Sequence, residues 1–167
     1  MNRTKITLLA ITLICVSLLA YALYLQLALN MLPCPYCVLQ RYAFVAVALS
    51  CLIGLALPRA LHRIGFGLGL LSSLVGAAIA GKHVWILANP AITCGIDPLE
   101  TGLNKIFLAE ALPVFFKADG LCDTPYPPIF GLSIPAWALV WFIIFSLVLG
   151  ITFFSKKKAR ELFGKGH

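Results

Sequence analysis

The sequence has few charged residues. Asp, Glu, Lys and Arg make up 11% of its 167 residues, whereas hydrophobic residues make up 61%. A water-soluble domain carries about 25% charged residues. Too little polar surface is present to cover a water-soluble globule, so the composition predicts that lipid surrounds the chain. The net charge of +7 lies in short clusters between apolar runs, which is typical of membrane proteins rather than of nucleic-acid-binding domains.

Charged residues are absent or rare in four long apolar runs. A helix needs about 20 apolar residues to cross a bilayer core. The sequence therefore predicts an all-α membrane protein, a four-transmembrane-helix bundle that forms one integral membrane domain over residues 1–167. The expected helices cover residues 6–29, 35–57, 64–87 and 132–154, and the outer loops are residues 30–41 and 88–131.

The distribution of Lys and Arg predicts the orientation of the bundle. Nine of these residues lie at the ends of the chain and in the middle loop, against four on the other side, in or near the two outer loops. Because basic residues accumulate on the cytoplasmic side, we expect both termini in the cytoplasm. The nine are Arg3, Lys5, Arg59, Arg63, Lys156, Lys157, Lys158, Arg160 and Lys165, and the four are Arg41, Lys82, Lys105 and Lys117.

Two local patterns refine this picture. Gly65 and Gly69, and Ser72 and Gly76, stand four residues apart in the third run, a spacing that lets helices pack closely in lipid. In the long loop, apolar residues follow a helical stripe between Leu99 and Leu112, just before Pro113. This stripe predicts a short amphipathic helix that lies on the membrane surface or on a protein partner.

The six cysteines divide into two groups by their expected depth in the membrane. Two lie in the middle of apolar runs, where a thiol stays protonated and inert. Four lie on the outer side, where bacterial compartments are oxidising and disulfides persist. Four cysteines allow three pairings. The inner two are Cys15 and Cys51, and the outer four are Cys34, Cys37, Cys94 and Cys122.

The outer Cys34-Pro35-Tyr36-Cys37 is a C-x-x-C motif with three interpretations. It could be half of a zinc site completed by Cys94 and Cys122, but these two are 28 residues apart and lack paired spacing. It could be a structural disulfide, although closing so short a loop constrains the unfolded chain little. It could also be a redox pair.

Local geometry favours the redox pair. Pro35 suits the first position of a helix, with Cys34 as its N-cap, and the positive end of that helix would stabilise a thiolate. Arg41 follows Cys37 by four residues and shares its helix face. It is either a fixed charge beside a thiolate and an electron acceptor, or a side chain that extends to the lipid head groups.

These features together resemble the bacterial disulfide bond formation protein B family, DsbB. The resemblance covers nearly the whole chain, and its specificity lies in the combination of C-x-x-C, an arginine four residues later and a second cysteine pair in the long loop. It rests on four apolar helices, Cys34-Pro35-Tyr36-Cys37-Val38-Leu39-Gln40-Arg41, Cys94, Cys122, Gly131-Leu132 with Pro135 and Trp137, and Leu162-Phe163-Gly164.

The resemblance implies a protein of the bacterial inner membrane that reoxidises a periplasmic, thioredoxin-fold thiol oxidase (DsbA-like) and passes the electrons to membrane quinone, either ubiquinone or menaquinone. It implies two redox disulfides, Cys34–Cys37 and Cys94–Cys122. Cys94 would react with the partner, Cys122 would pass electrons to Cys34, and Cys37 would face the quinone. Arg41 and His83 would lie near the quinone, and no metal is expected.

Two alternatives remain at this point. One is a quinone reductase of the vitamin K epoxide reductase type, in which C-x-x-C lies late in the chain rather than before the second helix. The other is a membrane scaffold without enzymatic activity, held together by permanent disulfides.

Overall fold

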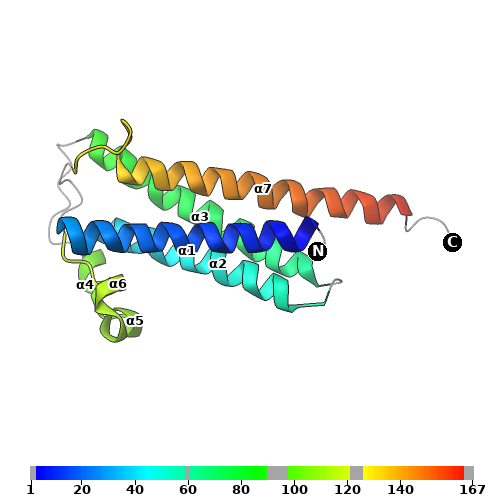
Figure 1. Cartoon of the computed structure of the whole chain (residues 1–167), viewed down its shortest axis with the longest axis horizontal. Coiled ribbons are helices and arrows are strands. Elements are labelled where there is room, and N and C mark those ends of the chain that lie inside the picture. The colour runs from blue at the N-terminus through cyan, green and yellow to red at the C-terminus, as the bar shows by residue number, and fades with distance from the viewer. Residues whose placement is uncertain (1–2, 59–60, 90–97, 121–125, 164–167) are drawn as a thin grey trace.

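A computed structural model gives the fold, and it describes residues 3–58, 61–89, 98–120 and 126–163; side chains are described only as far as Ser155. Four long helices dominate it (Figure 1). They are α1 (Arg3–Leu29), α2 (Pro35–Ala56), α3 (His62–Ala88) and α7 (Ile134–Phe163). All four are long and apolar enough to cross a membrane, which confirms the predicted membrane bundle.

The helix ends follow local chemistry. Asn30, with φ of 50°, turns the chain after α1, a conformation that Asn tolerates better than most residues. α2 ends at Ala56 before Pro58, which cannot continue a helix. α7 extends well past residue 154, where the apolar run predicted its end. Helix formation needs backbone hydrogen bonds and good helix formers such as Lys, Ala, Arg and Glu, whereas the membrane limit depends on apolarity.

The long helices pack in chain order: α1 on α2, α2 on α3 and α3 on α7. Small residues permit this, as predicted. A Cβ on Gly65 would overlap the backbone of Gly54 in α2, and one on Gly76 would overlap the ring of Phe142 in α7. Within the described residues, α1 and α7 do not pack against each other along their length.

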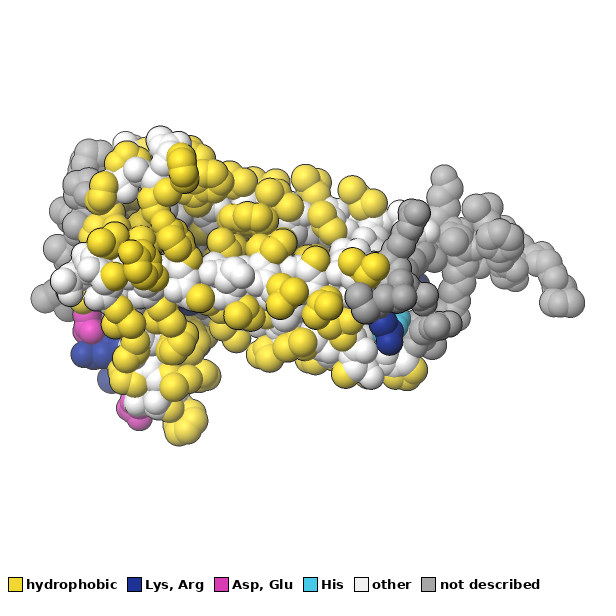
Figure 2. All heavy atoms as spheres, viewed as in Figure 1, with side chains coloured by type: hydrophobic (Ala, Val, Ile, Leu, Met, Phe, Trp, Pro, Cys, Tyr) yellow, Lys and Arg dark blue, Asp and Glu magenta, His cyan; other side chains and the backbone are white. Residues whose placement is uncertain are grey.

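The surface between the two ends of the bundle is apolar. Figure 2 shows hydrophobic side chains along the length of one face, with charged side chains towards the ends. Large apolar side chains on this type of surface are exposed because lipid, not protein, surrounds them. Examples with more than half of their surface exposed are Leu13, Val16, Leu71, Leu147 and Ile151.

The long loop forms three short helices rather than the single amphipathic helix that was predicted. They are α4 (Pro98–Asn104), α5 (Phe107–Ala111) and α6 (Pro113–Phe116), and they lie at one end of the bundle (Figure 1). Ile106 has extended dihedral angles and interrupts the helix. The predicted helical character of this segment is correct, but the helix that carries the apolar stripe is interrupted at Ile106.

The break arises because parts of the loop are tied to the bundle and to each other. Asn104 donates to the carbonyl of Ala118 at 2.9 Å and accepts from its N–H at 2.8 Å, which closes the loop across fourteen residues. Leu103 turns inward to the side of α2, and Phe116 stacks on Tyr42 with ring centroids 4.4 Å apart. The buried residues of this second core are Val38, Leu103, Ala109, Phe116 and Ala118.

Candidate functional site

The two cysteines of the C-x-x-C motif form the first turn of α2, as predicted. Cys34 is the N-cap, Pro35 occupies the first turn, and the Cys34 sulfur accepts from the backbone N–H of Cys37 at 3.4 Å. The two Sγ atoms are 3.3 Å apart. A disulfide bond is about 2.05 Å long, so the two sulfurs would approach each other by about 1.2 Å to form one.

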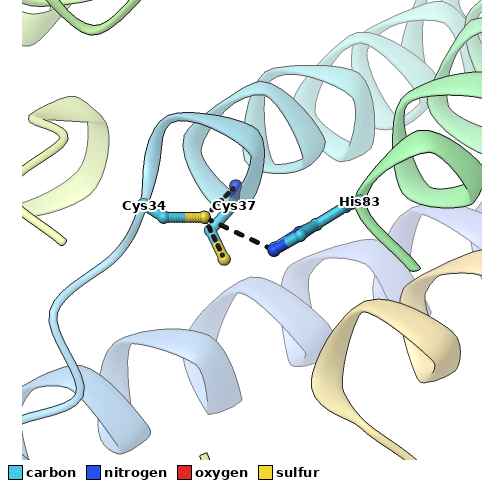
Figure 3. Close-up of side chains that lie close together, drawn as sticks. All are labelled: Cys34, Cys37 and His83. Carbon is cyan, nitrogen blue, oxygen red and sulfur yellow. Dashed lines mark hydrogen bonds between the residues drawn. The ribbon is translucent and has the colours of Figure 1, made fainter. Parts of the chain in front are cut away.

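A buried histidine faces this pair from the neighbouring helix. His83, near the end of α3, points at the sulfurs (Figure 3), and its Nε2 lies 3.6 Å from the Cys34 Sγ. On the other side of the ring, Gln40 Nε2 lies 3.2 Å from His83 Nδ1. An amide nitrogen can only donate, so Nδ1 accepts and Nε2 carries the hydrogen that faces the sulfur. The tautomer of His83 is therefore linked to the orientation of the Gln40 amide.

Arg41 joins three parts of the structure. Its guanidinium donates to Gln26 Oε1 of α1 at 2.8 Å and to the carbonyl of Phe115 in α6 at 2.9 Å. Gln26 in turn donates to the carbonyl of Val114 at 3.0 Å. Only 7% of Arg41 is exposed, so this cation is held by protein groups one turn from Cys37. The interpretation as a side chain that extends to lipid head groups does not fit this position.

An apolar cavity of about 530 Å³ adjoins the site. It lies between α1 and α7, the two long helices that do not pack along their length, and it is partly open. Leu and aromatic side chains form most of the wall, including Leu18, Leu25, Phe44, Trp137 and Trp141. The polar and ionisable side chains in the wall include those of Cys34, Cys37, Gln40, Arg41 and His83.

Three hydrogen bonds hold the long loop against the segment that precedes Cys34. The N–H groups of Asp119 and Gly120 both donate to the carbonyl of Pro33 at 3.1 Å. Gly120 is necessary at this place because a Cβ would collide with the backbone of Leu32. Tyr126 donates its hydroxyl to the carbonyl of Leu32 at 3.0 Å. Burial, and then the nearby thiolates, raise the pKa of Tyr126, so its hydroxyl keeps the proton that this hydrogen bond needs.

Known proteins of similar sequence show the family of the chain. The family model "Disulfide bond formation protein DsbB" matches residues 4–152. The chain belongs to the DsbB family. A disulfide bond formation protein B of Herminiimonas arsenicoxydans is 55% identical over 157 residues, which are 94% of this chain and 99% of the relative. One from Ralstonia nicotianae is 45% identical, over 90% of this chain and 94% of the relative.

Membership of the DsbB family decides between the alternatives that the sequence left open. It assigns the chain to disulfide bond formation, and therefore argues against a protein of the vitamin K epoxide reductase type and against an inert scaffold. The structure adds that Cys15 and Cys51 are fully buried in the bundle core, as expected for cysteines without a redox role.

The DsbB site contains residues that the sequence did not single out. The structure brings together Cys34, Cys37 and His83, and places Arg41 in the same cavity wall. Cys94 and Cys122 lie outside the described residues. Gln26, Gln40 and Tyr126 were missed, because each is defined by a contact with a residue far away in the sequence. The only available sign was a polar side chain, such as Gln26, inside an otherwise apolar run.

Proposed function

We propose that the chain is a quinone-dependent thiol oxidase that reoxidises a DsbA-like dithiol protein in the periplasm. The observation that supports this most is the position of Cys34 and Cys37, which lie beside His83 in the wall of an apolar cavity between two membrane-spanning helices. A redox pair in that position can receive electrons from a water-soluble protein and release them to an acceptor dissolved in lipid.

The cavity suits a quinone in size and in chemistry. Its volume of about 530 Å³ lies within the range of about 300–1,000 Å³ that is usual for small-molecule sites. Its apolar wall suits a ring and an isoprenoid chain, and the gap between α1 and α7 offers access from lipid. A quinone bound there would accept two electrons and two protons. Arg41 and His83 are the groups that would hold its oxygen atoms.

The residues around the pair have separate tasks. Cys34 and Cys37 give up two electrons and two protons when their disulfide forms. With the Gln40 amide oriented as in the structure, His83 presents an N–H to the Cys34 sulfur and stabilises it as a thiolate. Arg41 supplies a fixed positive charge in a site from which water is largely excluded, where such a charge acts most strongly.

The loop contacts support electron transfer from Cys122 to Cys34. Gly120 and Tyr126, on either side of residues 121–125, are hydrogen-bonded to Pro33 and Leu32 directly before Cys34. Cys122 follows Gly120 by two residues in the sequence, so the described residues on both sides of its segment are anchored next to Cys34. Direct attack of one sulfur on another needs such proximity. Cys94, paired with Cys122, would exchange with the partner protein.

We further propose that the chain lies in the bacterial inner membrane, with both termini in the cytoplasm and the Cys34 end in the periplasm. The Lys and Arg distribution supports this orientation. So does the fold, because α1 begins and α7 ends at the end of the bundle opposite α4, α5 and α6 (Figure 1). A periplasm-specific reporter enzyme fused after Asn30 or after Thr101 should be active. An inactive fusion at either point would contradict the proposed orientation.

The experiment for the proposed function mixes the purified protein with a reduced, thioredoxin-fold dithiol partner and a soluble quinone analogue. Quinone absorbance should fall as partner disulfide appears, one quinone per disulfide. Cys37→Ser should stop both changes. Partner oxidation that continues in Cys37→Ser at the wild-type rate would refute the role of this site.

A trapping experiment tests the outer pair. A partner that lacks its second cysteine cannot complete the exchange, so it should accumulate as a mixed disulfide with Cys94. Dithiothreitol should separate the two proteins, and Cys94→Ser should remove the complex. If peptide mapping found the partner joined to Cys122, the roles assigned to these two cysteines would be reversed.

A further inference from the structure

We infer that the reduced Cys34–Cys37 pair and His83 form a binding site for a thiophilic metal cation of the Zn²⁺ class, and that this site exists only while the disulfide is open. The three side chains each offer one ligand atom, and these atoms all lie within 4.8 Å of one another. They come from two helices, with the cysteines on α2 and the histidine on α3 (Figure 3). This inference goes beyond the proposed function, since a bound cation would oppose turnover.

Two of the three distances between ligand atoms lie near those of tetrahedral coordination. Zn–S bonds of about 2.3 Å and Zn–N bonds of about 2.0–2.1 Å place neighbouring ligand sulfurs about 3.8 Å apart and sulfur and nitrogen about 3.5 Å apart. In the structure the Cys34 and Cys37 sulfurs are 3.3 Å apart, and the Cys34 sulfur lies 3.6 Å from His83 Nε2. The third separation, between the Cys37 sulfur and the His83 nitrogen, is within 4.8 Å, so side-chain rotations of up to about 1.3 Å would complete three corners of a tetrahedron.

Gln40 can serve as the supporting group that such a site requires. A histidine that binds a metal through Nε2 usually donates its other N–H to an oxygen, which fixes the ring. Gln40 is 5% exposed and already contacts His83 Nδ1. A half-turn of its amide group would present Oε1 to Nδ1 and leave the Nε2 lone pair directed at the cysteines. The same side chain can therefore support either tautomer of His83.

The fourth corner would face the apolar cavity that both cysteines and His83 line. Three protein ligands with one open position can be completed by water or another small ligand. Binding transfers no electrons: two Sγ–metal bonds and one nitrogen–metal bond form, and up to two thiol protons are released to solvent. The oxidised pair cannot bind in this way, because each sulfur is then joined to the other.

Direct binding of Co²⁺, a spectroscopic substitute for Zn²⁺, tests the inference without quinone or partner, so its result does not depend on the proposed function. The experiment uses full-length protein with Cys94→Ser and Cys122→Ser, so that the outer thiols cannot bind the cation. After reduction and removal of reductant in detergent, it should bind one Co²⁺ and show thiolate-to-cobalt charge transfer with tetrahedral d–d bands. Zn²⁺ should bleach these bands at one equivalent.

Variants separate this site from other thiols. Oxidation of the pair, or Cys34→Ser, should abolish the bands, and Cys15→Ala should leave them unchanged. Gln40→Ala keeps all three ligands and should weaken binding about 10- to 100-fold, as the loss of an orienting partner does. His83→Ala should weaken it at least as much. Absence of tetrahedral bands in the reduced protein, or equal binding by the oxidised protein or by Cys34→Ser, would overturn the inference.

Discussion

Arg41→Ala should impair the use of quinone far more than it impairs folding. The guanidinium makes short hydrogen bonds of 2.8 Å to Gln26 and 2.9 Å to the carbonyl of Phe115, and it also lines the cavity. A hydrogen bond to a charged group contributes about 1.5–3 kcal/mol. If Arg41 makes one such bond to bound quinone, its loss should lower kcat/KM for quinone about 10- to 100-fold, since about 1.4 kcal/mol corresponds to a factor of ten.

The assay measures steady-state oxidation of the dithiol partner at several concentrations of a soluble quinone analogue. The loss should appear mainly as a higher KM for quinone. Arg41→Lys should recover part of it, because the charge remains while the planar fork of donors is lost. The KM for the dithiol partner should change little in either variant.

Gln26→Ala is the matched control for this prediction. It removes the same contact with α1, and the bond from Gln26 to Val114, but leaves the charge of Arg41. Quinone kinetics should stay near wild type, while proteolysis of the loop helices should become faster. Equal effects of Gln26→Ala and Arg41→Ala on quinone KM would show that Arg41 acts only by fastening the loop. Unchanged kinetics in Arg41→Ala would refute any role at the quinone.

Three further predictions follow from the packing and the cysteines. Cys37→Ser should abolish quinone reduction in the turnover assay, whereas Cys15→Ala, a change in the bundle core, should retain most of it. Gly76→Val should destabilise the bundle by about 1–3 kcal/mol through overpacking, seen as a lower midpoint of thermal unfolding in detergent, while Gly81→Ala, with no atom within 4 Å of the added group, should not. Asn104→Ala removes two hydrogen bonds across the loop and should speed limited proteolysis there. An unchanged cleavage rate would contradict the conclusion that these bonds hold the loop closed.

The sequence predicted the bundle well because lipid imposes simple rules. Apolar length located all four long helices, and Pro35 marked the start of α2 correctly. The predicted run 132–154 agrees with the apolar span Ile134–Ser155 of α7, and the helix itself continues to Phe163 because apolarity limits the membrane span but not the helix. The broken loop helix depends on the two bonds between Asn104 and Ala118, which join residues that no periodic pattern relates.

The candidate site was predictable only where its residues are close in the sequence. Cys34, Cys37 and Arg41 lie within two turns of one helix, so helical spacing was sufficient to group them. His83 was named through the family resemblance alone, since its contact with Cys34 spans 49 residues. The contact of Gln40 with the other ring nitrogen of His83 spans 43 residues and depends on how α2 packs against α3.

A single-turnover measurement tests the central claim most directly. Protein with Cys94→Ser and Cys122→Ser, reduced at Cys34 and Cys37, is mixed without oxygen with a soluble quinone analogue. The account predicts that one quinone is reduced per protein while mass spectrometry detects formation of the Cys34–Cys37 disulfide at the same rate. Two results would contradict the account. One is quinone that remains oxidised; the other is quinone reduction at an undiminished rate in protein that also carries Cys37→Ser.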